Sequence, residues 1–354
     1  MVIRWRHVVG VLLACILGAF LIAWSGLISV KASTGHWRIT DIVLHWVMRS
    51  SVRTAAVGTK VPAFTEGMLP MAAGHFEAGC AVCHGSPAMP RLESVAKMLP
   101  PPPDLKDKIA TWSDAELFQI VQHGVRYTGM PAWPAADRED EAWAVVAFLR
   151  RYPELDGDQY HALMGFPAIA SQGMDRLIAT CNGCHAPYRL GPESLIPRLA
   201  GQSATYLEQA LTAYAEGTRP SGVMAVAIEK LTEAELKDLA RHFAGEGADP
   251  MPLLAGDLFE RGQTLALKGD PSRGLPACLS CHDKTEANPS YPRLSGQPAS
   301  YLANQLRLFV EKKRGGGPFQ EVMTRAAAKL EANDISALAA YFSARDMADQ
   351  NAPN

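Results

Sequence analysis

The sequence predicts an all-α protein in which three small helical domains follow one membrane-spanning helix. An uncharged apolar stretch runs from Val8 to Val30, near the N-terminus. The motif Cys-x-x-Cys-His then occurs three times at nearly regular intervals, beginning at Cys80, Cys181 and Cys278. No segment shows the sustained alternation of apolar and polar residues that is typical of strands, whereas several show helical spacing. Together these features favour tandem helical domains over a fold built on a sheet.

The apolar stretch predicts a membrane anchor over residues 1–31. It is long enough to cross the hydrocarbon core as a helix, which takes about 20 residues. A cleavable signal peptide is the main alternative, but its apolar region usually has about 7–15 residues and ends at a small-residue cleavage site, which we do not find here. Arg4 and Arg6 precede the stretch and favour a cytoplasmic N-terminus. We therefore expect a single-pass protein of the bacterial inner (cytoplasmic) membrane, with everything after Lys31 in the periplasm.

Residues 32–69 form a predicted juxtamembrane segment that contains an amphipathic helix. Between Ile39 and Val52, the residues Ile42, Trp46 and Arg49 recur at helical spacing. Such a helix can lie on a membrane surface or pack against a partner protein. An ordinary surface helix explains the pattern equally well, so both interpretations stay open.

The composition fits a globular chain of several domains with an added apolar segment. The chain has 354 residues, enough for two or three cores of ordinary size, and 48% of them are hydrophobic. It carries 34 Lys and Arg against 36 Asp and Glu, which gives a net charge of −2. This balance excludes the strongly basic surface that nucleic-acid binding requires, so we expect no nucleic-acid partner.

The second and third motifs belong to copies of one unit. Pro197 to Gln202 reads Pro-Arg-Leu-Ala-Gly-Gln, and Pro292 to Gln297 reads Pro-Arg-Leu-Ser-Gly-Gln. In both copies a Tyr-Leu pair follows and opens a stretch with helical apolar spacing. The first unit differs in its middle, where a proline-rich loop precedes Asp104. We call the three predicted domains the first, second and third units and expect them at residues 70–155, 160–246 and 250–345, with a C-terminal tail at 346–354.

Helix-capping patterns mark several helix starts. Ser113, with Glu116 three residues later, predicts a helix within the first unit, and Thr232 with Glu235 predicts the closing helix of the second. We expect the closing helices of the three units at residues 138–151, 233–244 and 334–344, the last of them behind Asn333.

The Cys-x-x-Cys-His motifs predict covalent attachment of haem. Two thiols one helical turn apart can form thioethers with the vinyl groups at one edge of a porphyrin, while the adjacent histidine reaches the iron. A zinc site would need a second ligand pair near each first one, a thioredoxin-type dithiol needs no histidine, and a disulfide would not explain the histidine either. We therefore expect three c-type haems. The attachment cysteines are Cys80, Cys83, Cys181, Cys184, Cys278 and Cys281, and the histidines that reach the iron are His84, His185 and His282.

Each unit also offers a methionine for the opposite face of the iron. A His and Met pair favours ferrous iron and therefore raises the reduction potential. Met130 lies between a glycine and a proline, and Met224 and Met323 occupy matching positions, each seven residues before a leucine. A single methionine is more often a flexible core filler. Three at corresponding positions favour the role of iron ligand.

These motifs resemble those of known families. Residues 160–345 resemble the diheme cytochromes of the c-four type, which have two class I cytochrome c domains in tandem. Residues 70–153 resemble the class I domains found in cytochrome subunits of periplasmic dehydrogenases and in donors to terminal oxidases. The resemblance implies three tandem class I cytochrome c domains with three low-spin haems, the last two held close enough for fast electron exchange.

Three functions are compatible with this pattern. The first is a membrane-tethered relay that passes electrons in a respiratory chain, from a quinol-oxidising complex or dehydrogenase to a terminal oxidase or soluble carrier. The second is a fixed cytochrome subunit of a periplasmic dehydrogenase or oxidase complex. The third, a haem peroxidase or sensor, needs an iron with an open sixth position, which the three methionines disfavour. We therefore expect an electron-transfer protein rather than an enzyme, with redox proteins as its partners.

Overall fold

The computed structural model describes residues 4–28, 31, 35, 37–165, 172–245, 257–283 and 288–345. Within these ranges every regular element is helical, and the only extended pairing is an isolated bridge between Asp270 and Leu275. The all-α prediction is therefore confirmed. The predicted C-terminal tail, residues 346–354, lies outside the described residues, as does most of the predicted junction between the second and third units.

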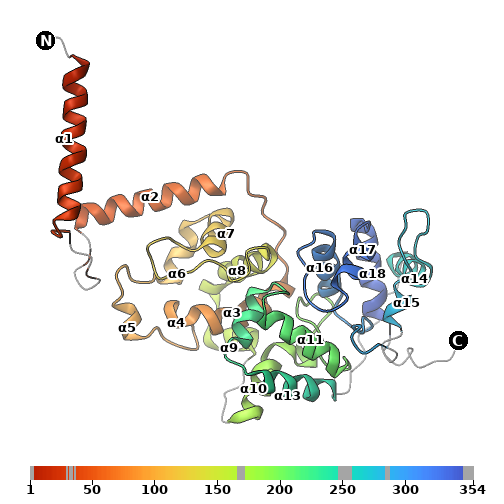
Figure 1. Ribbon diagram of the computed structural model, residues 1–354. Helices are drawn as coiled ribbons and strands as arrows, with labels where there is room; N and C mark the ends of the chain where they lie inside the picture. The colour runs from red at the N-terminus through yellow and green to blue at the C-terminus, as the bar shows by residue number, and fades with distance from the viewer. Residues whose placement is uncertain are drawn as a thin grey trace.

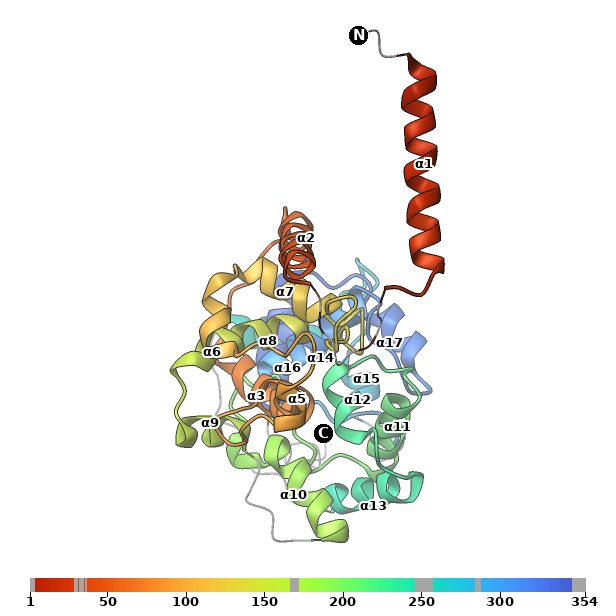
Figure 2. The same cartoon turned by 90° about the vertical axis from the view of Figure 1, so that its left-hand side faces the viewer.

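Two long helices precede the first motif (Figure 1). Helix α1 (Trp5–Trp24) has a mean hydropathy of 2.4 and no residue buried against the rest of the protein, so it is long and apolar enough to span a membrane. A signal sequence meets the same criteria. Helix α2 (Arg38–Ala56) covers residues 39–52, where the sequence predicts an amphipathic helix. It runs across the lower end of α1 in Figure 1 and is seen nearly end-on, close to the same level, in Figure 2.

The C-terminal half of α2 packs on α7 (Asp114–His123) of the first unit. The guanidinium of Arg49 lies 4.4 Å from the ring centroid of Trp112, and Arg53 forms an ion pair with Glu116 at 3.6 Å. The apolar side chains of its N-terminal half, among them Ile42 and Trp46, stay exposed. The helix is thus attached to the first unit while one apolar surface faces away from it.

The first unit is built around aromatic contacts between its first and last helices. The ring of Phe76 lies 5.3 Å from that of Phe148 and 5.2 Å from that of Tyr152, and Phe118 stacks on Trp143 at 4.2 Å. These contacts hold both ends of the unit around the first motif. Besides α7, the helices here are α3 (Leu69–His75), α4 (Ala81–His84), α5 (Glu93–Ala96), α6 (Leu105–Lys108), α8 (Glu139–Arg151) and the following α9 (Gly157–Met164).

The second and third units have similar helices around separate cores, but the one helix that ends at the second motif corresponds to two helices in the third unit. Leu207 and Phe243 pack in the second core, and Leu302 and Phe342 take the corresponding places in the third. The second unit has α10 (Gly173–His185), α11 (Ala204–Ala215), α12 (Gly222–Ile228) and α13 (Glu233–Ala244), and the third has α14 (Asp257–Lys268), α15 (Leu279–His282), α16 (Ala299–Val310), α17 (Gln320–Ala327) and α18 (Ala332–Ala344).

The helix starts follow the capping prediction in two units and differ in one. The capping boxes of Ser113 and Thr232 are present at α7 and α13. Helix α18 begins before the expected Asn333, because Glu331 caps it and Asp334 accepts the Glu331 backbone N–H at 3.1 Å. Asp334 is also fully buried and forms ion pairs with Arg261 and Arg273, at 2.6 and 2.7 Å.

Candidate haem sites

The three motif histidines share one hydrogen-bond arrangement. In each, Nδ1 lies within hydrogen-bond distance of a proline carbonyl oxygen: His84 with Pro103 at 3.2 Å, His185 with Pro197 at 2.9 Å and His282 with Pro292 at 3.0 Å. A carbonyl oxygen only accepts, so each Nδ1 carries the proton and donates it. Each Nε2 is thereby left with a free lone pair, the form in which an imidazole binds a metal.

Burial keeps these histidines neutral. It lowers the pKa of His84, His185 and His282 below the ordinary value, because a charged imidazolium loses hydration inside the protein. A neutral ring with a fixed tautomer is a good iron ligand. The structure therefore supplies, at all three motifs, what an axial histidine needs.

The prolines that accept these hydrogen bonds were not assigned a role from the motifs alone. Pro197 and Pro292 open the two Pro-Arg-Leu repeats, 12 and 10 residues after their histidines, so the repeat itself is a signal that could have found them. Pro103 follows its histidine at a longer spacing, at the end of the proline-rich loop. Only the folded loop brings its carbonyl back to the first histidine.

Four of the partly buried motif thiols, those of Cys80, Cys181, Cys184 and Cys278, have a raised pKa and stay neutral. Burial raises the pKa of Cys80 to about 12 and those of Cys181 and Cys278 to about 11, because a thiolate is poorly solvated there. A redox dithiol or a thiolate metal site instead needs a lowered pKa. The described part of the chain also contains no cluster of three or more His, Cys, Asp or Glu side chains placed to hold a metal ion. These thiols fit conversion to thioethers.

One cavity of about 670 Å³ holds the second and third candidate sites together. The predicted ligand sets of both units line it, and they are Cys181, Cys184, His185 and Met224 on one side and Cys278, Cys281, His282 and Met323 on the other. The structure thus brings eight predicted site residues around one space. The first set, Cys80, Cys83, His84 and Met130, is not part of this lining and belongs to the first unit.

Two of the three candidate methionines lie on short helices, and the third lies in a loop. Met224 lies on α12 and Met323 on α17, the short helices that precede the closing helices of their units. Met130 lies in the loop after α7, and this loop folds back closely on Gly124. A Cβ at Gly124, whose φ is +64°, would lie within 2.6 Å of Met130 O and Pro131 O, so the loop needs a glycine here.

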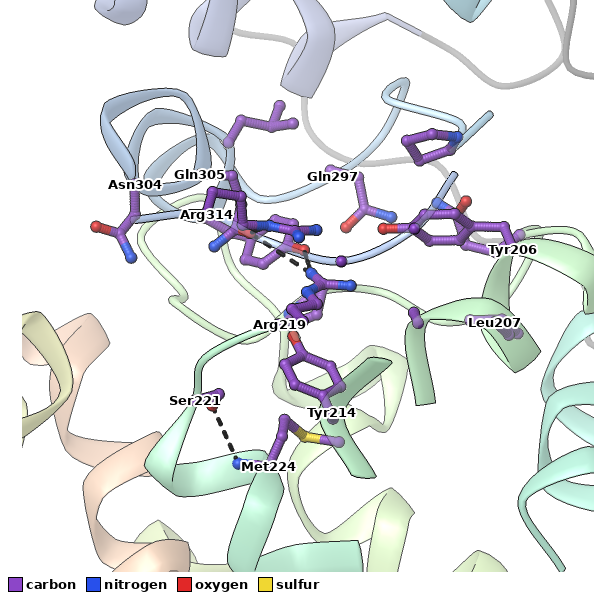
Figure 3. A pocket seen from close by; sticks show the side chains of 18 of the residues that line it. Tyr206, Leu207, Tyr214, Arg219, Ser221, Met224, Gln297, Asn304, Gln305 and Arg314 are labelled. Carbon is purple, nitrogen blue, oxygen red and sulfur yellow. Dashed lines mark hydrogen bonds between the residues drawn. The ribbon is translucent and has the colours of Figure 1, made fainter. Parts of the chain in front are cut away.

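Two buried arginines enter the cavity between the second and third units (Figure 3). Arg219 donates to the Tyr301 hydroxyl at 3.3 Å and stacks over the Tyr214 ring at 4.4 Å, while Arg314 Nε donates to Gln305 Oε1 at 2.7 Å. Among the residues that the structure describes, neither has a carboxylate partner in an ion pair. Burial and the neighbouring Arg219 lower the pKa of Arg314 from its ordinary value.

Two buried cations beside one another need an anion. Charges of like sign in a low-dielectric space repel, and a buried charge without a counter-ion is costly. The propionate carboxylates of haem would supply the missing negative charge inside this cavity. The donor set therefore fits haem at both ends of the cavity: neutral histidines, paired thiols, a methionine and guanidinium groups.

The second and third units dock through two equivalent glutamines. Gln202 accepts from Arg293 N at 3.0 Å and donates to Arg293 O at 2.7 Å. Gln297 does the same with the backbone of Arg198, at 3.0 and 2.8 Å. Each arginine directly follows the proline that holds the histidine of its own unit. The contact between the units is therefore built next to the two candidate iron-ligand histidines.

Comparison with known proteins agrees with this chemistry. A family model described as cytochrome c oxidase, cbb3-type, subunit III, matches residues 69–149. Cytochrome c4 of Azotobacter vinelandii is 35% identical over 192 residues, which cover 49% of this chain and 87% of that protein. The chain belongs to the cytochrome c4 family.

A thiosulfate dehydrogenase electron acceptor of Thiomonas intermedia is 30% identical over 174 residues, 48% of this chain and 80% of that protein. The crystal structure of reduced cytochrome c4 from Pseudomonas stutzeri has a TM-score of 0.45 and 27% identity, and covers 50% of this chain and 100% of that one.

Membership of the cytochrome c4 family makes this chain an electron-transfer protein with covalently bound haem iron. The haem iron supplies reversible one-electron chemistry when it is bound. The motif cysteines would hold the group by thioethers, and the motif histidines would offer it an imidazole nitrogen in a fixed tautomer. One relative is named as the electron acceptor of thiosulfate dehydrogenase.

Proposed function

We propose that this chain is a membrane-tethered triheme cytochrome c that passes electrons in a respiratory chain. Its electrons come from a quinol-oxidising complex or dehydrogenase and go towards a terminal oxidase or a soluble carrier. The observation that carries the proposal is the proline-bound Nδ1 of the motif histidine, which occurs at all three motifs. The domains at 70–155, 160–246 and 250–345 each hold one haem.

Each haem has its own pair of axial ligands. The pairs are His84 with Met130, His185 with Met224 and His282 with Met323. A thioether opposite an imidazole favours the ferrous state and closes the sixth position of the iron. A closed sixth position suits electron transfer and does not suit peroxidase or gas-sensing chemistry, so the protein is a carrier rather than an enzyme.

Haem counting tests this proposal directly. The purified holoprotein should contain three haems per chain, and replacing the two cysteines of any one motif with alanine should remove one haem. The reduced protein should show low-spin spectra and bind carbon monoxide slowly. Two haems in a chain with three intact motifs would contradict the proposal, and rapid carbon monoxide binding at one haem would show that its methionine is not a ligand.

The membrane attachment rests on α1 and α2. Helix α1 anchors the chain in the inner membrane, and the haem domains lie in the periplasm, where the apolar side chains of α2 face the lipid surface. The exposure of Ile42 and Trp46 and the position of α2 across the end of α1 support this placement. Mass spectrometry of the mature protein should recover the peptide 5–24, whereas its loss would identify α1 as a cleaved signal sequence.

A fixed subunit of a larger complex is the second candidate. The relative in Thiomonas intermedia is named as the electron acceptor of thiosulfate dehydrogenase, which favours a dehydrogenase as donor. Purification in mild detergent separates the two candidates. A free relay should run at the mass of one chain in its micelle, while a dehydrogenase or oxidase that stays bound at constant ratio would establish the subunit role.

A further inference from the structure

Glu141, near the start of α8 in the first unit, is buried against the second unit. Its side chain is only 2% exposed. Ser221 Oγ donates to Oε1 at 2.5 Å, and the backbone N–H groups of Gly222 and Val223 donate to Oε2 at 2.6 and 3.4 Å. From its own unit, the Trp133 indole donates to Oε2 at 3.2 Å. One carboxylate thus joins two units that are far apart in the sequence.

Both sides of this contact carry a candidate iron ligand. Trp133 comes three residues after Met130 in the methionine loop of the first unit. Ser221 comes three residues before Met224 and accepts the Met224 backbone N–H at 3.1 Å (Figure 3). The carboxylate of Glu141 therefore lies between the two segments that present methionines to the first and second haems.

Arg138 supplies the positive charge that this buried carboxylate needs. Its Nη1 lies 3.0 Å from Glu141 Oε1 and donates to Pro220 O at 2.8 Å, so it binds the same segment of the second unit. Arg138 also pairs with Asp140 at 2.8 Å, and Asp140 accepts from Asn304 of the third unit at 2.9 Å. A fully hydrogen-bonded ionic network of this kind specifies one arrangement of the units.

The packing at this contact leaves no space for a side chain. A Cβ on Gly222 would lie 2.5 Å from Trp133 Nε1, although the backbone conformation there is ordinary for any residue. On its other face Trp133 packs on the buried ring of His75 at 4.5 Å. At the equivalent position of the third unit, two residues before Met323, the chain has Glu321, which is exposed. Glycine is thus present where the first unit docks, and a charged residue where it does not.

We propose that Glu141, Trp133 and the segment 220–223 form a rigid docking joint through which electrons pass between the first haem and the haem pair. The proposal rests on the proposed function, since it requires a haem in the first unit. Electron transfer slows steeply as the distance between carriers grows. A joint that fixes the segments carrying Met130 and Met224 against each other therefore sets the rate of this step. The electron leaves the ferrous iron of one haem, which becomes ferric, and enters the ferric iron of its neighbour across the joint, which becomes ferrous. The step needs no other reactant. Glu141 is a positioning residue here.

The test compares Gly222→Ala and Trp133→Phe with Glu321→Ala as the matched control. In the holoprotein, rapid photoreduction followed by absorbance at the haem bands measures electron exchange between the first haem and the pair, and exchange within the pair. Hydrogen–deuterium exchange of the peptides that contain 133–141 and 219–226 reports the joint itself. Gly222→Ala should raise deuterium uptake there and slow transfer from the first haem by about an order of magnitude. Trp133→Phe should produce a smaller slowing, and Glu321→Ala no change.

Two results would overturn the proposal. The first is an unchanged rate between the first haem and the pair in a variant whose deuterium uptake shows an opened joint. The second is equal slowing within the pair, which would mean that the substitutions disturb the second haem site itself. Fewer than three haems in the parent protein would instead defeat the proposed function, so the two failures are distinguishable.

Discussion

The side-chain amide of Gln297 binds both backbone groups of Arg198 in the neighbouring unit, donating to its carbonyl at 2.8 Å and accepting from its N–H at 3.0 Å. Both residues are buried, each 3% exposed. The carbonyl of Pro197, which precedes Arg198, accepts the hydrogen bond from His185. The amide that docks the third unit therefore also fixes the backbone that orients the histidine of the second.

Replacing Gln297 with leucine should destabilise the holoprotein. It leaves a buried N–H and a buried carbonyl without partners, and each such group costs about 1–3 kcal/mol. Denaturant unfolding followed by far-ultraviolet circular dichroism, which reports the helices of all three units, measures the change. Gln209→Leu is the matched control, because Gln209 also crosses between the units but binds only the Ser290 hydroxyl, at 3.0 Å. Equal losses in the two variants would show that the backbone contact has no special weight.

Single substitutions of the candidate methionines should each affect one haem. Replacing Met130, Met224 or Met323 with alanine removes a thioether that favours ferrous iron, so the reduction potential of that haem should fall while the other two stay unchanged. A spectroscopic redox titration of each variant resolves this. A titration curve identical to that of the parent protein would exclude that methionine as a ligand.

Arg219 should raise the potentials of the haem pair. A positive charge in a poorly hydrated cavity stabilises the more electron-rich, reduced state, so Arg219→Gln should lower the potentials of the pair by tens of millivolts. Arg219→Lys keeps the charge and should retain most of the potential. Redox titration at fixed pH and ionic strength is the measurement, and equal potentials in the glutamine and lysine variants would contradict an electrostatic role.

Because of the buried His75, the free energy of unfolding should fall in mild acid. Burial lowers the pKa of His75 from 6.5 to about 4, so between these values the unfolded chain binds a proton that the folded protein excludes. Stability therefore falls as pH drops from about 6.5 towards 4, by up to about 1.4 kcal/mol per pH unit. His75→Phe keeps a ring against Trp133 and should flatten this part of the profile of unfolding free energy against pH. Replacing the exposed His161 with glutamine should leave the profile unchanged.

The sequence was sufficient for the helices, because these depend on local patterns. The helical spacing, the capping boxes of Ser113 and Thr232, and the Cys-x-x-Cys-His motifs all act over a few residues. The role of the Pro103 carbonyl could not be predicted, because the position of this carbonyl depends on how a long loop folds. The same holds for Glu141: in the sequence it is one of three acidic residues at the start of a helix, a common place for such residues. Only the packing of the units reveals its partners.

The reciprocal glutamine contacts have the pattern of a two-fold dimer interface, in which residue i meets j and j meets i. The second and third units lie in one chain and keep this two-fold arrangement. A third domain beside them cannot contact both units in the same way. The first unit contacts both units, but only the second meets it through the segment before its candidate methionine, where Gly222 packs on Trp133 and the third unit has Glu321. The corresponding surfaces of the two units therefore differ: that of the second unit faces the first unit, and that of the third is open to solvent at Glu321.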